Sequence, residues 1–494
     1  MSPWRHRRWP VPLALGLALA LLAPSFGSPA GAEATPSVRL FVASTDLTVQ
    51  RNRRDFVFVD PGAFVTPVGK DFKLIVNRPD YDTPITAKQV DPDSGQILRT
   101  FGADHLDGWF GLATFAHLTA LNGRGDIVAS QDVSFCPYAS VRLSDESPIA
   151  SAYPFGCYAY NPFFRGTVWG VDMGWASGLS GGDYYYGGGL EWKARRDAYT
   201  VRVEIDPEWV DLLSIPASDA AAEVEVSVVD RGTMAPTSSP SRVSPEAPAA
   251  VPYASTPIVT VPDPDTLPDF FALPAWGINV RRGYLNFNAT EWNAGPGPMV
   301  VDGFRGDAES TMDAYQYFLR DGKPVGRALI GQLEYVGGRH NHWHLEDFIR
   351  YSLLDANKNP IQISPKESWC LVPTDAIDLS IPNADWDAYA QDLHSSCNFY
   401  QPSSLWVREV VPVGWGDTYG QYFNGGGFDI SDLPNGRYYI RTEVNPGGSI
   451  IEVTTANDTQ DRLIRLRGRP GHRRHVIVPP WKGIDTENTC YYCG

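Results

Sequence analysis

The sequence has no apolar run long enough to cross a membrane, and it carries little positive charge. A membrane-spanning helix needs about 20 predominantly apolar residues, and the apolar run at residues 11–22 is shorter than that. Only 41 Lys and Arg residues stand against 57 Asp and Glu, which gives a net charge of −16 at pH 7. Such acidity argues against nucleic acid as a partner and would attract cationic substrates, or it serves solubility alone. We expect a folded protein that, after removal of the signal peptide, associates with neither a membrane nor a nucleic acid.

The N-terminal residues predict export. A basic start that holds three arginines precedes the apolar run, and Ala-Gly-Ala at residues 30–32 provides a small-residue cleavage site. We expect residues 1–32 to be a signal peptide and the mature protein to be secreted and extracellular. The adjacent arginines Arg7 and Arg8 leave the choice between general and twin-arginine export open.

Cysteine is scarce as well, with six residues in 494. All six follow the predicted signal peptide, which agrees with an oxidising compartment. Fifteen pairings are formally possible, and we expect each cysteine to pair with its nearest neighbour in sequence. The expected disulfides are Cys136–Cys157, Cys370–Cys397 and Cys490–Cys493, the last of which could instead be a redox or metal pair.

Long helices are not expected, because 46 glycines and 41 prolines predict many turns. We predict an all-β protein. Residues 33–230 read as an antiparallel β-sandwich-like region of one or two units, because short β-rich runs alternate with turn signals. The expected strands there are residues 55–59, 71–76, 110–120, 127–135, 199–205 and 223–229.

A change in composition divides the chain. Residues 231–266 are rich in Pro, Ser and Ala, which is typical of a linker. Residues 267–470 are expected to form a second, β-sandwich-like catalytic domain with little helix, followed by a tail at 471–494. Its expected strands are residues 284–289, 347–354, 405–411, 437–444 and 461–466, and residues 307–319 could form a short helix.

Aromatic clusters stand out in the first region, at residues 169–175 and 184–186. Such side chains could bind a cell-wall or other extracellular polymer, but packing in a core is the more frequent explanation.

Three of the nine histidines lie at alternate positions in one short stretch, as His340, His342 and His344. Alternate residues of a strand share a face, so the three rings would point the same way. Neutral imidazole is a common ligand for zinc and copper. A straight strand would place the outer pair about 13 Å apart, so the segment must bend, and Gly337-Gly338 would permit this. A surface cluster without a metal is the alternative.

Two metals suit three imidazoles. Zinc with an open fourth position would give a hydrolase, in which Glu346 or Asp347 activates water. Copper suits an all-imidazole site in an oxidising compartment at least as well.

Several ordered motifs resemble the lysyl oxidase family over about residues 267–470. The stretch His340-Asn341-His342-Trp343-His344 resembles the copper-binding H-x-H-x-H element of that family. It is followed by Lys366-Glu367-Ser368-Trp369-Cys370 and then by Asp417-Thr418-Tyr419-Gly420. These resemble the elements whose lysine and tyrosine form lysine tyrosylquinone.

The resemblance implies a Cu(II)-dependent amine oxidase with a self-made organic cofactor. His340, His342 and His344 would hold copper, and Lys366 and Tyr419 would be cross-linked as the quinone. Primary amines, free or on peptidyl-lysine, would become aldehydes with O2 as the acceptor and with release of ammonia and peroxide. An electron sink of this kind is needed, because acid–base residues alone cannot oxidise an amine. Asp347 is a candidate for the base that removes the α-proton.

The resemblance also implies a Ca²⁺ site. Residues 267–270 resemble the opening motif of the family and residues 452–458 its closing acidic run. Carboxylates, Asn oxygens and a backbone carbonyl suit calcium. The implied ligands are Asp269, Phe270, Glu452, Asn457 and Asp458.

A different class of function competes with the oxidase. Copper or calcium could be bound without catalysis, by an extracellular β-sandwich adhesion protein that attaches to a polymer through residues 33–230. The Lys–Tyr quinone separates these hypotheses, because only the oxidase needs it.

Overall fold

The computed structural model describes residues 37–144, 146–148, 150–157, 161–179, 189–230, 253, 256–306, 311–337, 340–365, 368–388, 395–421 and 427–487. The predicted signal peptide, Lys366, residues 184–186 and the Cys490–Cys493 pair lie outside this part of the chain. Nearly all regular structure within it is β-strand, so the predicted all-β fold class is confirmed. Within the same residues, no helix has the length and apolar content needed to cross a bilayer.

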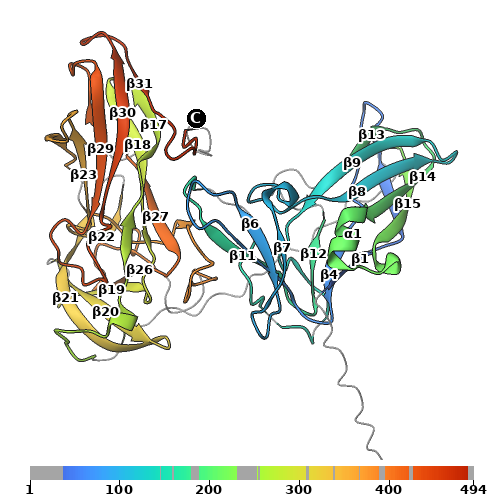
Figure 1. Cartoon of the computed structure of the whole chain (residues 1–494), viewed down its shortest axis with the longest axis horizontal. Helices are drawn as coiled ribbons and strands as arrows, with labels where there is room; N and C mark the ends of the chain where they lie inside the picture. Colours follow the sequence, from blue (N-terminus) through green and yellow to red (C-terminus); the bar gives the residue numbers. More distant parts are fainter. Residues whose placement is uncertain are drawn as a thin grey trace, which may run out of the picture. The chain divides into compact units, whose positions relative to one another are not determined.

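The first region holds four sheets, whose strands pair antiparallel except where β2 joins β15 (Figure 1). The largest has the order β2 (Asp46–Gln50), β15 (Ala221–Val229), β14 (Ala198–Ile205), β8 (Leu112–Asn122) and β9 (Ile127–Phe135). The second has the order β11 (Gly166–Val171), β5 (Phe72–Asn77), β6 (Thr86–Val90) and β7 (Ile97–Phe101). The other two have the orders β1 (Ser37–Val42), β4 (Ala63–Val68), β12 (Trp175–Gly178), β10 (Val141–Arg142), and β13 (Leu190–Lys193), β3 (Phe56–Val59).

A single α-helix, α1 (Pro207–Leu213), follows β14 in the described residues. It begins where the Asp206 side chain accepts a hydrogen bond from the Glu208 N–H, with proline at the first helical position. Three short 3-10 helices complete the structure, η1 (Ala103–His105), η2 (Ala217–Asp219) and η3 (Pro264–Thr266).

The second region holds three sheets, again antiparallel. One has the order β16 (Phe270–Ala272), β18 (Tyr284–Asn293), β27 (Trp415–Gly420) and β25 (Asp375–Ala376), with β17 (Trp276–Arg281) and β28 (Phe428–Asp429) also on β18. The next has the order β22 (His342–Leu345), β21 (Lys323–Val336), β20 (Met312–Arg320), β19 (Met299–Phe304) and β26 (Trp406–Val411). The last has the order β24 (Pro360–Ile363), β23 (Ile349–Leu354), β29 (Gly436–Val444), β30 (Thr459–Gly468) and β31 (Arg474–Ile477).

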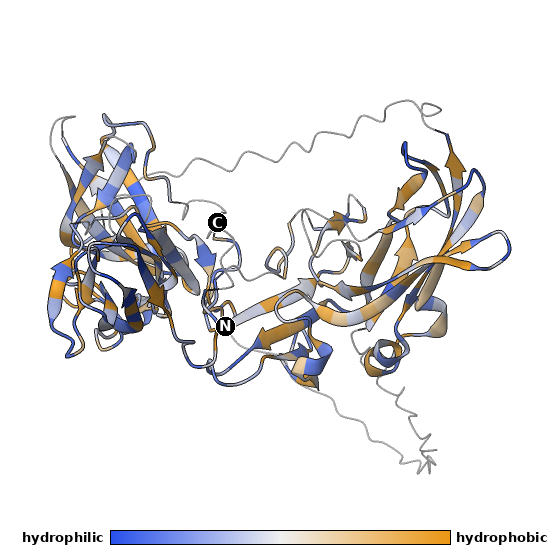
Figure 2. Ribbon diagram, turned by 90° about the horizontal axis from the view of Figure 1, so that it is seen from above, coloured by the Kyte–Doolittle hydropathy of each residue, from blue (hydrophilic) through white to orange (hydrophobic). Residues whose placement is uncertain are grey.

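Each region has its own apolar core. Along the strands hydrophobic residues alternate with polar ones (Figure 2), as expected when one face of a sheet is buried. One core is built on residues such as Phe72, Phe115 and Trp169, and the other on Phe287, Trp343 and Trp369. Core packing therefore explains Trp169 of the first aromatic cluster, which is fully buried.

The short helix suggested for residues 307–319 is wrong over the part that the structure describes. β20 (Met312–Arg320) is a strand there, paired with β19 on one side and β21 on the other. Its first side chains alternate between buried and more exposed positions. Pairing with two neighbours outweighs the local helix preference of this stretch.

A segment of the first region packs on the second. The Asn161 side chain donates to the hydroxyl of Thr290 on β18 at 3.0 Å, and the Arg165 N–H donates to the Ile377 carbonyl at 2.7 Å. The Phe163 ring lies in a small apolar cluster with Trp276 and Trp292. Residues 161–166 thus support the sheet that carries β27 from outside the predicted catalytic domain.

Candidate active site

The three histidines converge at the start of β22. Ring nitrogens of His340, His342 and His344 all lie within 4.8 Å of one another, and the Nε2 atoms of His342 and His344 are 2.8 Å apart. His344 is fully buried and His342 nearly so. The bend that the spacing required occurs at Asn341, whose backbone is left-handed with φ of 52°.

Hydrogen bonds orient two of these rings. The Nδ1 of His342 lies 2.6 Å from the carbonyl oxygen of His340 and can only donate to it. The Nε2 lone pair of His342 therefore faces the other rings. The Nδ1 of His344 lies 3.4 Å from the hydroxyl of Ser368, which in turn donates to Glu334 at 3.2 Å. Such outer partners are typical of metal-binding imidazoles.

The strand itself is fixed from both sides. On β21, Glu334 is in register with His344. On the other side the Trp343 indole donates to the Gln401 carbonyl at 3.1 Å, and the Phe399 ring lies 4.4 Å from the His342 ring. Phe399 is half exposed, so it covers the histidines toward solvent.

Residues 368–372 connect the histidines to Tyr419. Trp369 and Leu345 exchange backbone hydrogen bonds of 2.7 and 3.1 Å, which places this segment beside β22. The Tyr419 hydroxyl donates to the Cys370 carbonyl, and the Tyr419 ring lies 3.7 Å from the Trp369 ring between centroids. His344 and Tyr419, which are 75 residues apart in the sequence, thus both adjoin one segment. Lys366 itself lies outside the described residues.

The predicted Cys370–Cys397 disulfide is confirmed, as is Cys136–Cys157. Cys397 begins the loop that carries Phe399, and its carbonyl accepts a hydrogen bond from the Trp343 N–H at 3.0 Å. The disulfide therefore joins the cover of the histidines to the segment that contacts Tyr419.

Three buried carboxyl groups lie around Tyr419. The sequence did not indicate that these acids form a cluster. Glu291 on β18 is directly opposite Asp417 on β27, and both are fully buried, as is Glu409 on β26. The Leu371 N–H donates to Glu409 at 2.9 Å and the Val372 N–H to Asp417 at 3.2 Å. Neither oxygen of Glu291 has a hydrogen-bond partner among the described residues.

The electrostatics of this group follow from its burial. Burial raises the pKa of Glu291 well above its ordinary value, and burial together with the charge of Glu291 does the same to the pKa of Asp417. Burial, then the charges of Asp417 and Glu409, raises the pKa of the Tyr419 phenol. Two charges so close cannot both ionise cheaply, so this pair holds a proton more tightly than isolated carboxyls do.

The two acids beside the histidines are placed differently. Asp347 is exposed, on a left-handed backbone with φ of 54°. Glu346 is half buried, and burial raises its pKa, with a further contribution from Glu334. Neither is hydrogen-bonded to a ring of the three histidines in the interactions described above.

The residues implied for calcium also meet. The Asn457 side-chain amide and the Thr454 N–H both lie 3.3 Å from the Asp269 carboxylate. Glu452 accepts from the Phe270 N–H at 3.0 Å and from the Asn445 side chain at 2.7 Å. Burial raises the pKa of Glu452 to about 7 and that of Asp458 to about 6, with Asp269 adding to both. Oxygens of Asn457 and Asp458 are buried without a partner among the described residues.

Fold and site together define an all-β protein with a three-histidine centre of the metal-binding kind, joined by one segment to a buried tyrosine. Residues 337–472 match the model of the lysyl oxidase family. A stretch of 131 residues is 26% identical to lysyl oxidase homolog 2 of Gallus gallus, which covers 26% of this chain and 15% of that protein. The chain therefore spans only a small part of this relative. The lysyl oxidase resemblance predicted from the motifs is confirmed over this segment.

Proposed function

We propose that the protein is a secreted copper amine oxidase that converts primary amines to aldehydes with O2, through a quinone made from Lys366 and Tyr419. The observation that carries this proposal is the junction at residues 368–372, where the histidine strand contacts Ser368 and Trp369 while Tyr419 contacts Trp369 and Cys370. The resemblance of residues 337–472 to lysyl oxidases supports it. The two disulfides agree with an oxidising, extracellular location.

The histidines fit a copper ion by their chemistry. Three imidazoles converge, and a backbone carbonyl fixes one tautomer with its Nε2 lone pair toward the other rings. Cu(II) favours nitrogen ligands of this type. When bound to His340, His342 and His344, copper would supply redox chemistry with O2 near Tyr419, and the quinone would supply the electron sink for amine oxidation.

The residues of the chain have separate tasks in this proposal. Trp369 packs against the Tyr419 ring and the Cys370 carbonyl holds its hydroxyl, so the ring has one orientation. Asp417 lies two residues before Tyr419 on β27 and therefore projects from the same face of the strand. Its carboxylate is our candidate for the base that takes the α-proton of the amine, in place of the exposed Asp347. Burial, together with the proximity of Glu291, raises the pKa of Asp417, so its carboxylate would be a stronger base once deprotonated.

Asp417→Asn should lower amine-dependent peroxide release by roughly 10²- to 10⁴-fold, the usual contribution of a general base. Asparagine still accepts the Val372 hydrogen bond, so copper content and unfolding temperature should change little. Asp172→Asn is a matched control, because Asp172 is also buried and accepts a backbone N–H, from Ala152 at 2.9 Å. An Asp417→Asn protein that keeps activity within threefold of wild type would remove Asp417 from this role.

The proposed function is tested by staining copper-loaded protein for redox-cycling quinones and by measuring peroxide release from a panel of free and protein-bound amines. Wild type should stain and release peroxide, and Lys366→Ala should do neither. If wild type binds copper but neither stains nor turns over, the protein is a metal-binding adhesion module of the kind considered above. Zinc as the native metal would point to a hydrolase instead.

We further propose that Asp269, Glu452, Asn457, Asp458 and the backbone carbonyl of Phe270 bind Ca²⁺, and that the Phe270 N–H orients Glu452. Two carboxyls have raised pKa values, and two buried oxygens have no hydrogen-bond partner among the described residues. Such oxygens suit a hard cation. The Phe270 N–H is engaged with Glu452, as described above.

Calcium should stabilise the protein more at pH 8 than at pH 5. Without the ion, carboxyls whose pKa is raised in the folded state favour folding at low pH, and this contribution is lost as the pH rises through about 6 to 7. Saturating Ca²⁺ should raise the unfolding temperature at pH 8 by about 5 °C. The increase should be smaller at pH 5 and absent in Glu452→Gln/Asp458→Asn. An equal increase at both pH values, or in that variant, would contradict a site at these residues.

A further inference from the structure

The outer face of β29, β30 and β31 carries a row of three arginines and one histidine. Arg437 on β29 is opposite Arg465 on β30, and Arg467 on β30 is opposite His475 on β31. Arg465 and Arg467 are two residues apart on one strand, so all four side chains project from the same face of the sheet. All four are exposed, whereas Ile464 and Leu466 between them are buried. We call this row the basic face.

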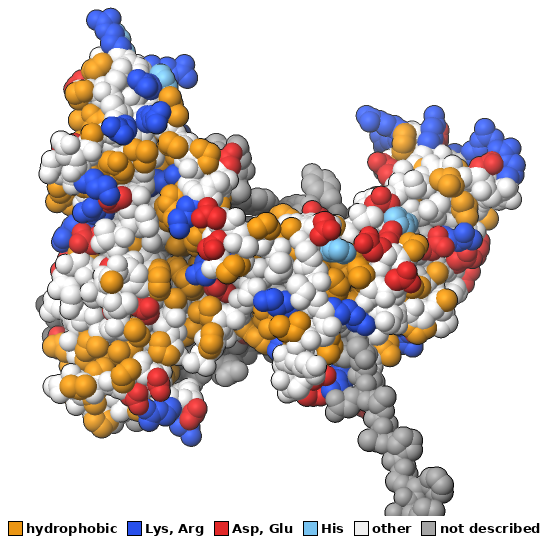
Figure 3. All heavy atoms as spheres, in the orientation of Figure 1, with side chains coloured by type: hydrophobic (Ala, Val, Ile, Leu, Met, Phe, Trp, Pro, Cys, Tyr) orange, Lys and Arg blue, Asp and Glu red, His pale blue; other side chains and the backbone are white. Residues whose placement is uncertain are grey.

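The basic face contrasts with the rest of the chain. Residues 462–475 contain six arginines and two histidines and no acid, in a chain of net charge −16. Lys and Arg side chains gather where β30 and β31 meet, at the upper left of Figure 3. None of the four residues of the basic face forms an ion pair within the described parts of the chain.

Repulsion between the like charges of the basic face destabilises the folded protein when no ligand is bound. Like charges directly opposite each other on neighbouring strands are destabilising. Arg437 and Arg465 form such a pair, and Arg467 follows about 7 Å further along β30 between Cα atoms. A ligand with repeating negative charges would remove this repulsion by contacting several cations at once.

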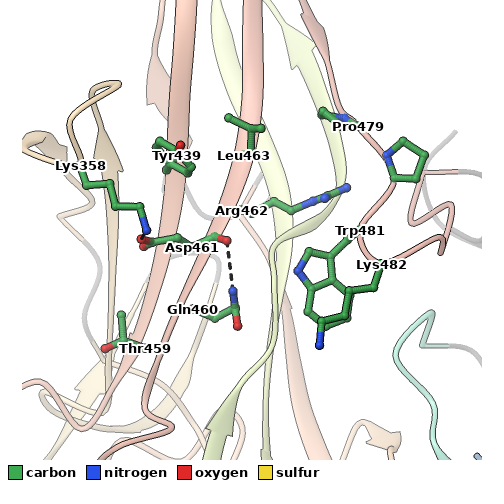
Figure 4. A pocket seen from close by; sticks show the side chains of 11 residues that line it. Lys358, Tyr439, Thr459, Gln460, Asp461, Arg462, Leu463, Pro479, Trp481 and Lys482 are labelled. Atoms are coloured by element: carbon green, nitrogen blue, oxygen red, sulfur yellow. Dashed lines mark hydrogen bonds and ion pairs between the residues drawn. The ribbon is translucent and has the colours of Figure 1, made fainter. Parts of the chain in front are cut away.

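A pocket of about 390 Å³ continues the basic face along the same strands. Tyr439 and Leu463, each two residues from an arginine of the basic face, lie in register with each other and line it (Figure 4). Trp481 and Lys482 border the other side. Asp461 in the pocket is already engaged by Lys358 and Arg441, at 2.9 and 2.7 Å. An extended chain could therefore lie over the cations and place one unit against the aromatic rings.

We propose that the basic face and this pocket bind an anionic polysaccharide, a polymer with regularly spaced carboxylate or sulfate groups. The cations lie in a row and not around one point, so they fit a linear polymer better than a single small anion. The net charge of −16 opposes binding of nucleic acid, and the disulfides indicate an extracellular setting, so nucleic acid fits less well. A lysine-rich protein would be repelled by this surface.

This inference goes beyond the oxidation chemistry and does not depend on it. None of its residues belongs to the histidine centre, the Tyr419 junction or the calcium group. The basic face would attach the protein to an acidic matrix while the rest of its acidic surface repels the same matrix, which would orient the bound molecule.

Binding of the full chain to dextran sulfate, measured near 0.1 M salt and again near 0.5 M salt, tests the proposal. Wild type should bind dextran sulfate at the lower salt and release it at the higher, because screening weakens such contacts. It should not bind neutral dextran. Arg465→Gln/Arg467→Gln should bind about 30-fold more weakly, because two exposed cations are removed at roughly 1 kcal/mol each. Arg465→Lys/Arg467→Lys should bind nearly as wild type.

The matched control is Arg124→Gln/Arg202→Gln, which removes two exposed arginines that pair with Asp126 and Glu223 in the first region. It changes net charge equally and should leave binding unchanged, and all variants should oxidise a small amine as wild type does. The proposal is overturned if wild type does not bind dextran sulfate, if the two glutamine variants behave alike, or if duplex DNA binds more tightly than the polysaccharide.

Discussion

Tyr419→Phe is expected to reduce amine-dependent peroxide release to background, at least about 10³-fold below wild type, because without the phenol oxygen the ring cannot become a quinone. The substitution removes one atom and keeps the ring against Trp369. Loss of the hydrogen bond to Cys370 should cost only about 1 kcal/mol of folding free energy. The histidines should still bind copper, so the defect should be confined to the organic cofactor.

Peptide mapping gives the decisive measurement. In copper-loaded wild type, residues 366 and 419 should be found in one cross-linked species, and in Tyr419→Phe the two peptides should separate. Tyr335→Phe is the control, because Tyr335 lies beside Trp343 at 5.7 Å between ring centroids but does not contact residues 368–372 in the interactions described. Separate, unmodified peptides from fully copper-loaded wild type would end the oxidase proposal.

His344→Ala should weaken copper binding by more than about 100-fold, since loss of an outer-shell partner alone costs 10- to 100-fold. His344 is the most buried of the three histidines and lies 2.8 Å from His342 between Nε2 atoms, so neither water nor a neighbouring side chain can easily replace it. Quinone staining should disappear with the metal, because copper is needed to form the cofactor in this proposal.

Copper titration monitored by metal content after gel filtration measures this effect. His475→Ala serves as the control, because it removes an exposed imidazole far along the sequence from β22. Copper binding by His344→Ala with wild-type affinity would show that the metal lies elsewhere. Restoration of staining at high copper concentration would agree with weakened copper binding and an intact capacity to form the quinone.

The strand pattern of this chain could be predicted well, because runs of β-favouring residues are bounded by turn signals. β5, β8, β9, β14 and β29 lie close to where these runs placed them. The two described disulfides could also be predicted, since their partners are near in sequence. The histidine spacing indicated convergence on one side, although the bend occurs at Asn341.

The buried carboxyls could not be found from sequence. Glu291 is more than a hundred residues before Glu409 and Asp417 in the chain, and an acid in a strand is normally a solvent-facing residue. Their common burial depends on the register between β18 and β27 and on the segment that follows Trp369. The helix suggested at residues 307–319 failed for a related reason, since pairing of β20 with two other strands is not visible locally.

Under the proposed function, the segment 368–372 determines when in folding the quinone can form. It touches β22, β26, β27 and, through a disulfide, the loop at Cys397, so the surroundings of Tyr419 exist only after strands from the whole second region have assembled. A nascent or misfolded polypeptide, with these strands apart, would remain chemically inert even in the presence of copper and oxygen. The quinone would thus form only after the tertiary structure is complete, so export can precede the appearance of its reactive carbonyl group.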